Sequence, residues 1–580
     1  MTSVLLIAVS GVDWAGFDAA TTAGIMPGMA ALRTRGLAGP LRGAAAGEGP
    51  AAWTSLVTGR QPEDHGVWRD VEAWQGGVRP VGPASWRTAP LWARLEAAGV
   101  SSGRVVWPAA RRGAAWPGAF VDEDFILASS RFPEDWALPL GCVPRDLRET
   151  LRDRRVHPAS ITAAMLEPFV EDLRAVDHAR DIWLPQLAVA MARAATAQAA
   201  AMWMTTQKAP EAIFAHQPWL GLVRGAFERR PEAALSRVVP VAWRFLDELI
   251  GALAAAAGPR TQVVVVSPGW RGRPGLVLAT GPDIADDPGA MGVDILDIAP
   301  TMLARFGLED AALGGQPIPG LTPPGLRSRA PEPPPPPSPA VVDVAEIEGL
   351  RKAGYRPPDG PPPAFRAQGL AELGWILLER AEPAAAAAAD EALQIDPANL
   401  LALSVRARAL IARGDPERLP PVAVALLAVA PDRGWGPVAY GAYHVMRQET
   451  PLAAPWLRRA ESDPDPATRI AVGALWLAAG RPASAGRVFA SVLDQEPLHV
   501  AAEIGLAMVA MTRRDFVTAE AALRRARRLD PGRPAIALQM AQLYARTGRT
   551  LEAGQAAEIA LRLGAPSAMV EAARFGRLRG

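Results

Sequence analysis

The sequence predicts an α/β domain, with a largely parallel sheet and helices on both faces, followed by an all-α superhelix of repeats. Three observations predict this. Short β-rich runs alternate with helical stretches before residue 325, a pattern typical of a parallel sheet covered on both faces. Five consecutive prolines, Pro333–Pro337, favour an extended linker. Beyond this linker, prolines recur every 33 or 34 residues.

Length and composition set the outer limits. The 580 residues are too many for one hydrophobic core, and we expect the α/β domain over residues 1–325, a proline-rich linker over 326–364 and the repeats over 365–580. Hydrophobic residues make up 49% of the chain and charged residues 21%, as in globular proteins. The net charge of +1 offers no excess of basic side chains, which argues against nucleic-acid binding.

Cysteine usage and hydropathy bear on the compartment. The single cysteine, Cys142, can form neither an internal disulfide nor a thiolate metal cluster, which fits a reducing compartment. The apolar run at residues 1–10 has no basic leader and no cleavage site, so it is expected to be a strand rather than a signal peptide. The alanine-rich stretch Leu187–Met204 is interrupted by Arg193 and does not reach the ~20 apolar residues of a membrane span. We therefore expect a cytoplasmic protein without a membrane span.

Four runs of the first part are expected to be strands. In parallel sheets the chemistry lies at the carboxyl ends of the strands, so candidate residues are sought there. The runs are Val4–Val9, Val105–Trp107, Gln262–Ser267 and Leu276–Thr280.

The second part carries a regular repeat. Five prolines close helical stretches at spacings of 34, 33, 33 and 34 residues. They are Pro397, Pro431, Pro464, Pro497 and Pro531.

The turns inside these repeats are also marked. Gly414, Gly480 and Gly548 fall where a tight turn between paired helices is expected, and Arg514 holds the equivalent place in another unit. The pattern resembles the tetratricopeptide repeat, which pairs two antiparallel helices in 34 residues. About six units fit between residues 367 and 566. Stacked units of this kind form a concave surface suited to a protein or peptide partner.

Three stretches of the first part match one known set of motifs in order and spacing. They are Leu5–Trp14 followed by Met26–Met29, then Pro50–Gly59 followed by Asp64–Gly66, and lastly Asp294–Leu303. Together they resemble the type I phosphodiesterase/nucleotide pyrophosphatase family of the alkaline phosphatase superfamily, over roughly residues 3 to 320. The resemblance implies an alkaline-phosphatase-like α/β fold.

The resemblance also implies a metal-dependent hydrolase, and here the sequence departs from the family. Such enzymes hold two metal ions, usually zinc, with aspartates and histidines, and attack phosphorus with a serine or threonine. Ser10 stands at the first metal-binding aspartate and Gly49 at the nucleophile. Pro268 and Gly269 stand at a late aspartate–histidine pair. We therefore expect no catalytic side chain, no metal ligand and no cofactor at these positions.

The remaining ligands of the family belong to a loop after a strand that we place at Met202–Thr206. No aspartate occurs between Asp181 and Asp247, and His216 is the histidine nearest to this loop. A further histidine of the family is missing from Arg271–Gly275.

Other polar residues do not replace these groups. His65 matches a turn motif that is not a ligand, and His178 is expected in a loop before the long helix that starts at Leu184. Thr54 and Ser55 are expected on a helix about one turn beyond the nucleophile position, which argues against a replacement nucleophile.

Three hypotheses follow. The preferred one is a pseudohydrolase and interaction scaffold whose repeats bind a protein partner. The second is an active metal-dependent phosphoester hydrolase with a divergent site for zinc or another divalent pair. The third is a pocket without catalysis in which Arg271 and Arg273 bind phosphate or sulfate, although a solvated surface loop explains these arginines equally well.

Overall fold

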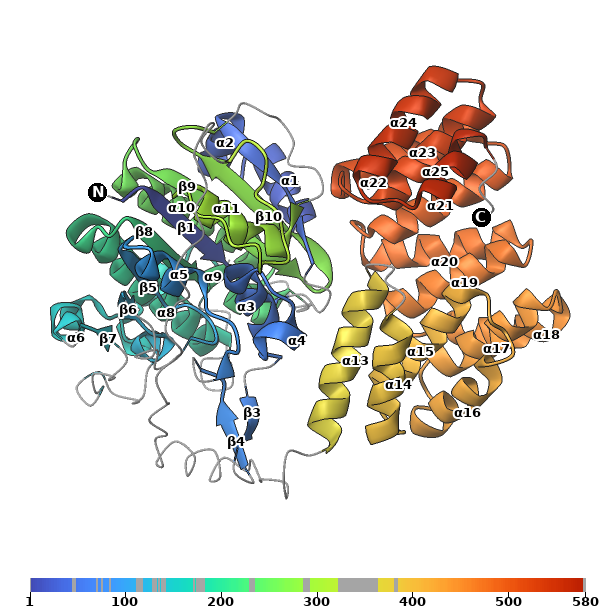
Figure 1. Cartoon of the computed structure of the whole chain (residues 1–580), viewed down its shortest axis with the longest axis horizontal. Helices are drawn as coiled ribbons and strands as arrows, with labels where there is room; N and C mark the ends of the chain where they lie inside the picture. The colour runs from blue at the N-terminus through green and yellow to red at the C-terminus, as the bar shows by residue number, and fades with distance from the viewer. Residues whose placement is uncertain are drawn as a thin grey trace. The chain divides into compact units, whose positions relative to one another are not determined.

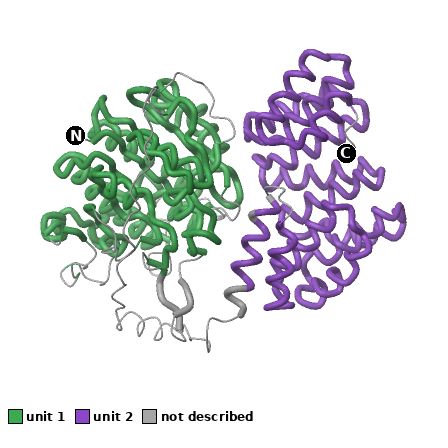
Figure 2. Tube along the Cα trace, in the orientation of Figure 1, with its two compact units in different colours: residues 1–357 green, residues 358–580 purple. Residues whose placement is uncertain are grey.

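The computed structural model describes residues 2–43, 48–68, 71–74, 77–82, 85–110, 118–127, 142–144, 146–170, 183–228, 235–284, 293–321, 363–379 and 384–576, with residues 133, 136 and 173. The chain forms two compact units, residues 1–357 and 358–580 (Figure 2). The linker predicted at residues 326–364 lies outside the described residues except for its last two positions. His178 lies outside them as well.

The first unit is built around a sheet with nine strands in its described part, in the spatial order β11-β2-β10-β9-β1-β8-β5-β6-β7 (Figure 1). β10 is antiparallel to β2 and β9, and β7 is antiparallel to β6, whereas all other neighbours are parallel. The sheet is therefore largely parallel, as the sequence predicts. The bounds are β1 Val4–Val9, β2 Gly36–Arg42, β5 Ser102–Val105, β6 Ala119–Val121, β7 Cys142–Val143, β8 Ala212–Gln217, β9 Gln262–Trp270, β10 Arg273–Thr280 and β11 Val293–Asp294. A separate hairpin pairs β3 Val71–Trp74 with β4 Gly77–Pro80.

Strand β1 shows how helices cover both faces of this sheet. Its alternate residues from Leu5 to Val9 belong to one hydrophobic core, and those from Val4 to Ala8 belong to a second. Because side chains alternate between the faces of a strand, a strand buried on both sides has a continuous apolar sequence. Helices α1 Trp14–Thr22, α2 Pro27–Thr34, α8 Trp183–Trp203, α9 Trp219–Phe227 and α10 Val238–Ala257 contribute to the first core, and α3 Pro50–Thr58, α5 Leu91–Ala97 and α11 Ile298–Ala304 to the second.

Several shorter helices complete the described part of this unit. They are α4 Pro62–His65, α6 Leu147–Thr150, α7 Ala163–Leu166 and a π-helix over Met204–Lys208.

Most expected strands are present, and one was wrong. β1 has the predicted bounds, while β5 ends at Val105 because Val106 adopts a positive φ of 57° and turns the chain out of the strand. The segment Met202–Thr206 is not a strand. It forms the end of α8 and the start of the π-helix, and the strand next to β1 is β8, further along the chain.

The second unit is a row of helix pairs. Six pairs are present, as the spacing of the prolines predicts, followed by one more helix. Their bounds are α13 Pro363–Glu379 with α14 Ala385–Ile395, α15 Leu400–Arg413 with α16 Leu419–Val429, α17 Trp435–Met446 with α18 Thr450–Ala460, α19 Pro466–Ala478 with α20 Pro482–Gln495, α21 Val500–Thr512 with α22 Phe516–Leu529, α23 Pro534–Arg546 with α24 Thr550–Arg562, and then α25 Ser567–Arg574.

The turns within the pairs follow the predicted positions. Gly414, Gly480 and Gly548 adopt positive φ values of 67°, 70° and 76°, and Arg514 adopts 61°. Gln448, with φ 63°, makes the turn between α17 and α18 and was not predicted. A left-handed residue ends a helix by letting its own N–H reach back to a carbonyl of the last turn.

Small residues allow the paired helices to approach closely. A Cβ atom on Gly441 would lie 2.4 Å from the side chain of Leu457. Cβ atoms on Gly473 and on Gly505 would each lie 2.5 Å from the ring of Phe489. Phe489 is thus enclosed between helices α19 and α21, which belong to consecutive repeats.

Hydropathy also bears on membrane insertion. Among the helices that the structure describes, none combines the length and apolar character needed to cross a lipid bilayer.

Candidate functional site

Four parallel strands, β9, β1, β8 and β5, bring their carboxyl ends together at the centre of the sheet. In register, Ala8 of β1 lies between His216 of β8 and Val266 of β9. Ser10 directly follows β1 and Val106 directly follows β5. The expected ligand positions of the family therefore gather at this edge, where parallel sheets place their chemistry.

Ser10 lies where the family's first metal-binding aspartate is expected, and it is hydrogen-bonded instead to a histidine. Its Oγ lies 2.7 Å from Nε2 of His216, and both side chains are buried. The neighbouring Gly11 has a positive φ of 80°, and a Cβ atom there would lie 2.4 Å from the backbone nitrogen of Gly221. This close approach packs the first turn of α9 against the end of β1.

His216 is held from its other side by the backbone. Its Nδ1 lies 3.2 Å from the carbonyl oxygen of Val106. Because a carbonyl oxygen only accepts, Nδ1 carries the proton and donates it, and Nε2 is left as an acceptor for the Ser10 hydroxyl. Burial lowers the pKa of His216 to about 3, so this imidazole stays neutral at ordinary pH.

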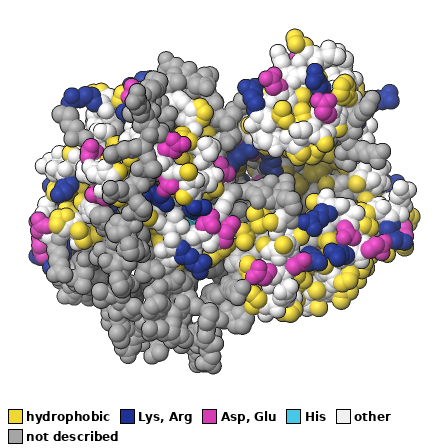
Figure 3. Space-filling view, viewed as in Figure 1, with side chains coloured by type: hydrophobic (Ala, Val, Ile, Leu, Met, Phe, Trp, Pro, Cys, Tyr) yellow, Lys and Arg dark blue, Asp and Glu magenta, His cyan; other side chains and the backbone are white. Residues whose placement is uncertain are grey.

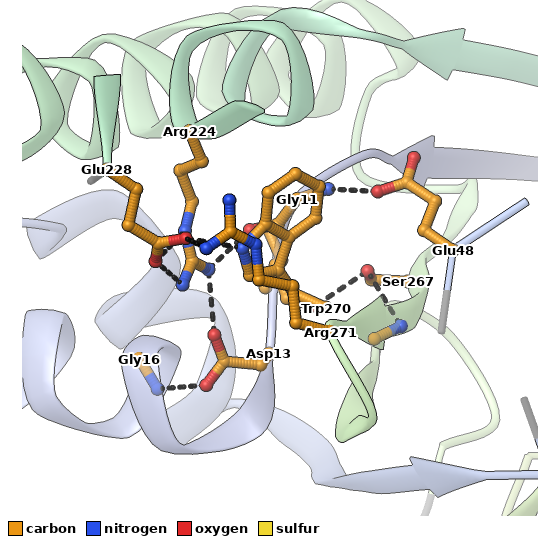
Figure 4. Close-up of polar contacts among 11 residues, drawn as sticks. Gly11, Asp13, Gly16, Glu48, Arg224, Glu228, Ser267, Trp270 and Arg271 are labelled. Carbon is orange, nitrogen blue, oxygen red and sulfur yellow. Dashed lines mark hydrogen bonds and ion pairs between the residues drawn. The ribbon is translucent and has the colours of Figure 1, made fainter. Parts of the chain in front are cut away.

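Glu48 completes this cluster, and the sequence reasoning gave it no role. Its Oε2 accepts a hydrogen bond of 2.7 Å from the backbone N–H of Gly11, as Figure 4 shows. Its carboxyl group also hydrogen-bonds the side chains of Ser10 and Trp53. Burial raises the pKa of Glu48 to about 7, against the opposing effect of these hydrogen bonds and of the charge on Arg224. The only signal in the sequence is an acidic residue directly before the expected nucleophile.

Gly49, at the expected nucleophile position, is the N-cap of helix α3. Its backbone is extended, with φ −180° and ψ 174°, a conformation that any residue adopts. A Cβ atom built on it meets no described atom within 4 Å. Neither backbone conformation nor space requires a glycine here, so the missing side chain is not explained by the fold.

A second polar group lies beside the first. Asp13 is fully buried, and its Oδ1 accepts from the N–H of Gly16 at 2.9 Å, which caps α1. Its Oδ2 accepts from Arg224 at 2.7 Å, and Arg224 also donates to the carbonyl of Gly11 at 2.7 Å. Asp13 therefore holds the framework together, in agreement with its match to a non-ligand position.

Arg224 continues to Glu228, which joins α9 to a hairpin. Glu228 accepts from Arg224 Nε at 2.9 Å and from the indole of Trp270 at 2.7 Å, and it forms an ion pair of 3.4 Å with Arg271 (Figure 4). Burial alone would raise the pKa of Glu228, but these cations and the indole outweigh it and lower the pKa. The charge of Arg271 is thus directed at Glu228, with which an anion would have to compete.

The hairpin also explains the late ligand positions. β9 does not end at Val266 or Ser267 but continues through Pro268 and Gly269 to Trp270. Arg271 and Gly272, with φ values of 49° and 77°, form a two-residue turn that matches the twist of the strands. The structure therefore places Pro268 and Gly269 inside a strand, and Arg273 at the first position of β10.

Comparison with known proteins decides the relationship of the first unit. Residues 4–268 match the family model described as type I phosphodiesterase / nucleotide pyrophosphatase. The first unit carries a phosphodiesterase-family domain. No curated protein matches the chain.

Solved structures similar to the chain include several repeat proteins. A human IFIT1 dimer with PPP-AAAA shares 15% identity, covers 38% of this chain and 56% of its own, and gives a TM-score of 0.30. A tetratricopeptide repeat protein from Parabacteroides merdae shares 15% identity over 41% of this chain and 93% of its own, with a TM-score of 0.31. Pseudomonas aeruginosa pilF shares 18% over 36% and 96%, with a TM-score of 0.27. The chain thus spans little more than half the length of IFIT1.

The motifs that the phosphodiesterase-family domain retains are structural in this chain. Asp294 and Asp297 cap the helical turn before α11 reciprocally, because each side chain accepts from the backbone of the other end. Asp247 of α10 accepts from the N–H groups of Gly28 and Met29, at 2.9 and 2.6 Å, and so caps α2. These carboxylates satisfy the free N–H groups at helix N-termini.

The remaining candidates of the domain lie in a separate buried pair. His65 is the last residue of α4 rather than a loop residue, and its Nε2 lies 2.9 Å from the Oγ of Ser55. Burial lowers the pKa of His65 to about 3. Ser55 and the neighbouring Thr54 are both buried within α3, where the sequence placed them.

The edge of the phosphodiesterase-family domain does not fit a pair of divalent cations. Two dications need several carboxylates close together, and no group of three or more histidine, cysteine, aspartate or glutamate side chains is found among the described residues. Asp13 is already paired with Arg224. The segment after β8, Pro218–Phe227, contains neither aspartate nor histidine.

Proposed function

We propose that the phosphodiesterase-family domain is a pseudohydrolase, a hydrolase fold that no longer hydrolyses. We also propose that the repeats over residues 365–580 bind a protein or peptide partner, so that the chain acts as an interaction scaffold. The hydrogen-bond chain from Glu48 through Ser10 to His216 is the observation that carries this proposal. It satisfies the polar groups of the edge with protons, where the family uses metal ions.

The retained motifs support the same reading. Asp13, Asp247, Asp294 and Asp297 each stabilise a helix start or an ion pair. Selection for a stable fold explains their presence without any need for catalysis. Metal-binding and nucleophilic side chains have no such structural use, and those are the positions at which Ser10, Gly49, Pro268 and Gly269 stand.

The metal content of the purified full-length chain tests the first half. We expect far less than one zinc or manganese ion per chain by elemental mass spectrometry. We also expect no hydrolysis of bis(p-nitrophenyl) phosphate above the rate in buffer. Stoichiometric metal together with turnover that a chelator abolishes would overturn the pseudohydrolase and establish a hydrolase with a divergent metal pair.

The surface of the repeats supports partner binding. The face of the second unit seen in Figure 3 mixes hydrophobic, basic and acidic side chains. Large apolar side chains are exposed along its helices, among them Leu452, Val517 and Leu551. Stacked helix pairs present such side chains on a continuous surface, and apolar contact area supplies most of the free energy of association.

Photo-cross-linking in the cells of origin tests the second half, because the chain has too few lysines for amine cross-linkers. A photoreactive residue is placed in the full chain at the exposed positions Ala474 or Val517 of the repeats, or at exposed Lys208 of the first unit as control. We expect the same protein to be captured at the repeat positions and not at Lys208. Capture at Lys208 alone would contradict binding by the repeats.

A further inference from the structure

The cluster at the carboxyl edge has a fixed direction of hydrogen bonding. His216 donates from Nδ1 to the carbonyl of Val106, so its Nε2 accepts, and Ser10 is the donor in the 2.7 Å contact. A serine hydroxyl carries one proton, which Ser10 gives to His216. Any further partner of Ser10 must therefore donate to it.

Glu48 is that further partner. A carboxylate only accepts hydrogen bonds, whereas a carboxylic acid has one O–H to donate. Glu48 can satisfy Ser10 with this O–H while its Oε2 accepts from the N–H of Gly11 at 2.7 Å. The complete chain from Glu48 to Val106 is possible only when Glu48 carries a proton.

We infer that Glu48 is a proton-operated latch, whose protonated form closes the carboxyl edge of the sheet and whose ionised form releases Ser10. Ionisation removes the donor that Ser10 requires and leaves a carboxylate in a buried site, where an uncompensated charge is costly. The segment before α3 then separates from Gly11. This latch is independent of whether the domain hydrolyses phosphodiesters.

The groups around Glu48 keep the proton near neutral pH. Gly11 and Ser10 face it from the end of β1, Trp53 from α3 and the neutral His216 from β8. Arg224 of α9 is the cation that acts on it. The charge of Arg224 is already met by Asp13 and Glu228, so burial prevails and the pKa of Glu48 rises to about 7.

The sign of the pH effect follows from this shift. In the open form Glu48 is exposed to water and has the ordinary pKa of 4.5. The closed form therefore holds a proton that the open form releases, and closure weakens as the pH rises. Opening should increase about tenfold per pH unit from about pH 4.5 up to about pH 7 and then level off.

Hydrogen exchange on the full-length chain between pH 5 and 8 tests the latch, with Glu48→Gln as the matched variant. The amide of glutamine donates to Ser10 and accepts from Gly11 but does not ionise, so it keeps the latch closed. We expect the exchange rate at the Gly11 amide, divided by that of Glu48→Gln at the same pH, to rise about tenfold per unit up to about pH 7. Taking this ratio cancels the intrinsic pH dependence of exchange.

Ser55→Ala is the control for a lost serine–histidine bond. It removes the pair with His65, which stays neutral over this pH range, so its effect on exchange should not depend on pH. A ratio of wild type to Glu48→Gln that is constant with pH would overturn the latch.

A second measurement avoids dependence on the folding of a variant. The infrared carbonyl band of a protonated carboxylic acid should be present in the wild-type chain at pH 5 and disappear with a midpoint near pH 7. Its absence at pH 5, after subtraction of Glu48→Gln or of the chain at pH 8, would show that Glu48 is ionised throughout and would also overturn the proposal.

Discussion

Ser10 Oγ lies 2.7 Å from His216 Nε2, and the two residues are brought together by the parallel pairing of β1 with β8. They lie 206 positions apart in the sequence. In the type I phosphodiesterase family this edge of the sheet would bind metal, and in this chain it is occupied by a hydrogen bond between neutral groups. The contact therefore links the lost ligand position to the buried acid beside it.

Replacing Gly49 by serine should stabilise the domain without making it a hydrolase. Serine caps a helix better than glycine and restricts the unfolded chain, which together are worth about 0.5–1 kcal/mol. Thermal unfolding and a phosphodiester assay measure the two effects. Gly11→Ser is the matched control and should destabilise, because its Cβ would lie 2.4 Å from Gly221. Metal-dependent turnover in Gly49→Ser would contradict the expectation.

Replacing Arg224 by methionine should strongly destabilise the first unit. The change leaves Asp13, which is fully buried, and Glu228 without their cation, and breaking a buried ion pair from one side costs roughly 3–5 kcal/mol. Denaturant unfolding measures the loss. The double variant Arg224→Met with Asp13→Asn should recover part of it, and a single variant as stable as the wild type would disprove the role of the pair.

Two glycines of the repeats should respond in opposite directions to alanine. Gly473→Ala places a Cβ atom 2.5 Å from the ring of Phe489, and overpacking of this kind costs roughly 1–3 kcal/mol. Gly554, inside α24, has open space around its Cβ position, so Gly554→Ala should stabilise by up to about 1 kcal/mol through helix propensity. Calorimetry of the two variants compares them. Equal effects would show that close packing does not select glycine at residue 473.

Arg514 should be improved by glycine. Its φ of 61° lies in the left-handed region, which costs a residue with a side chain roughly 1–2 kcal/mol, and its side chain is exposed. Arg514→Gly should therefore raise the melting temperature of the repeats. Gly480→Arg, at the equivalent turn with φ 70°, should lower it, and the opposite order would refute the turn assignment.

The sequence predicted the features that depend on local patterns. The apolar run of β1 and the spacing of the repeat prolines both reflect periodicities that a short segment carries by itself. β8 was misplaced because its residues, Ala212–Gln217, include two alanines and three polar or aromatic side chains rather than a β-branched run. The threonines of Met202–Thr206 looked more strand-like but continue the long helix α8.

The site was predictable only in part. Aligning motifs located Ser10, Gly49, Pro268 and Gly269, because their places follow from sequence spacing. The role of Glu48 depends on contacts with Ser10, Gly11 and Trp53, and its proton depends on burial, which no spacing encodes. The pairing of Arg271 with Glu228 was missed for the same reason.

Phe489 has a consequence for how the repeats unfold. Its ring lies against Gly473 of one repeat and Gly505 of the next, so neither helix can leave without exposing the same side chain to water. The free energy of this contact belongs to the junction rather than to either repeat. In a linear array, strong junctions lengthen the stretch that melts as one cooperative block. The helices from α19 to α22 should therefore unfold together.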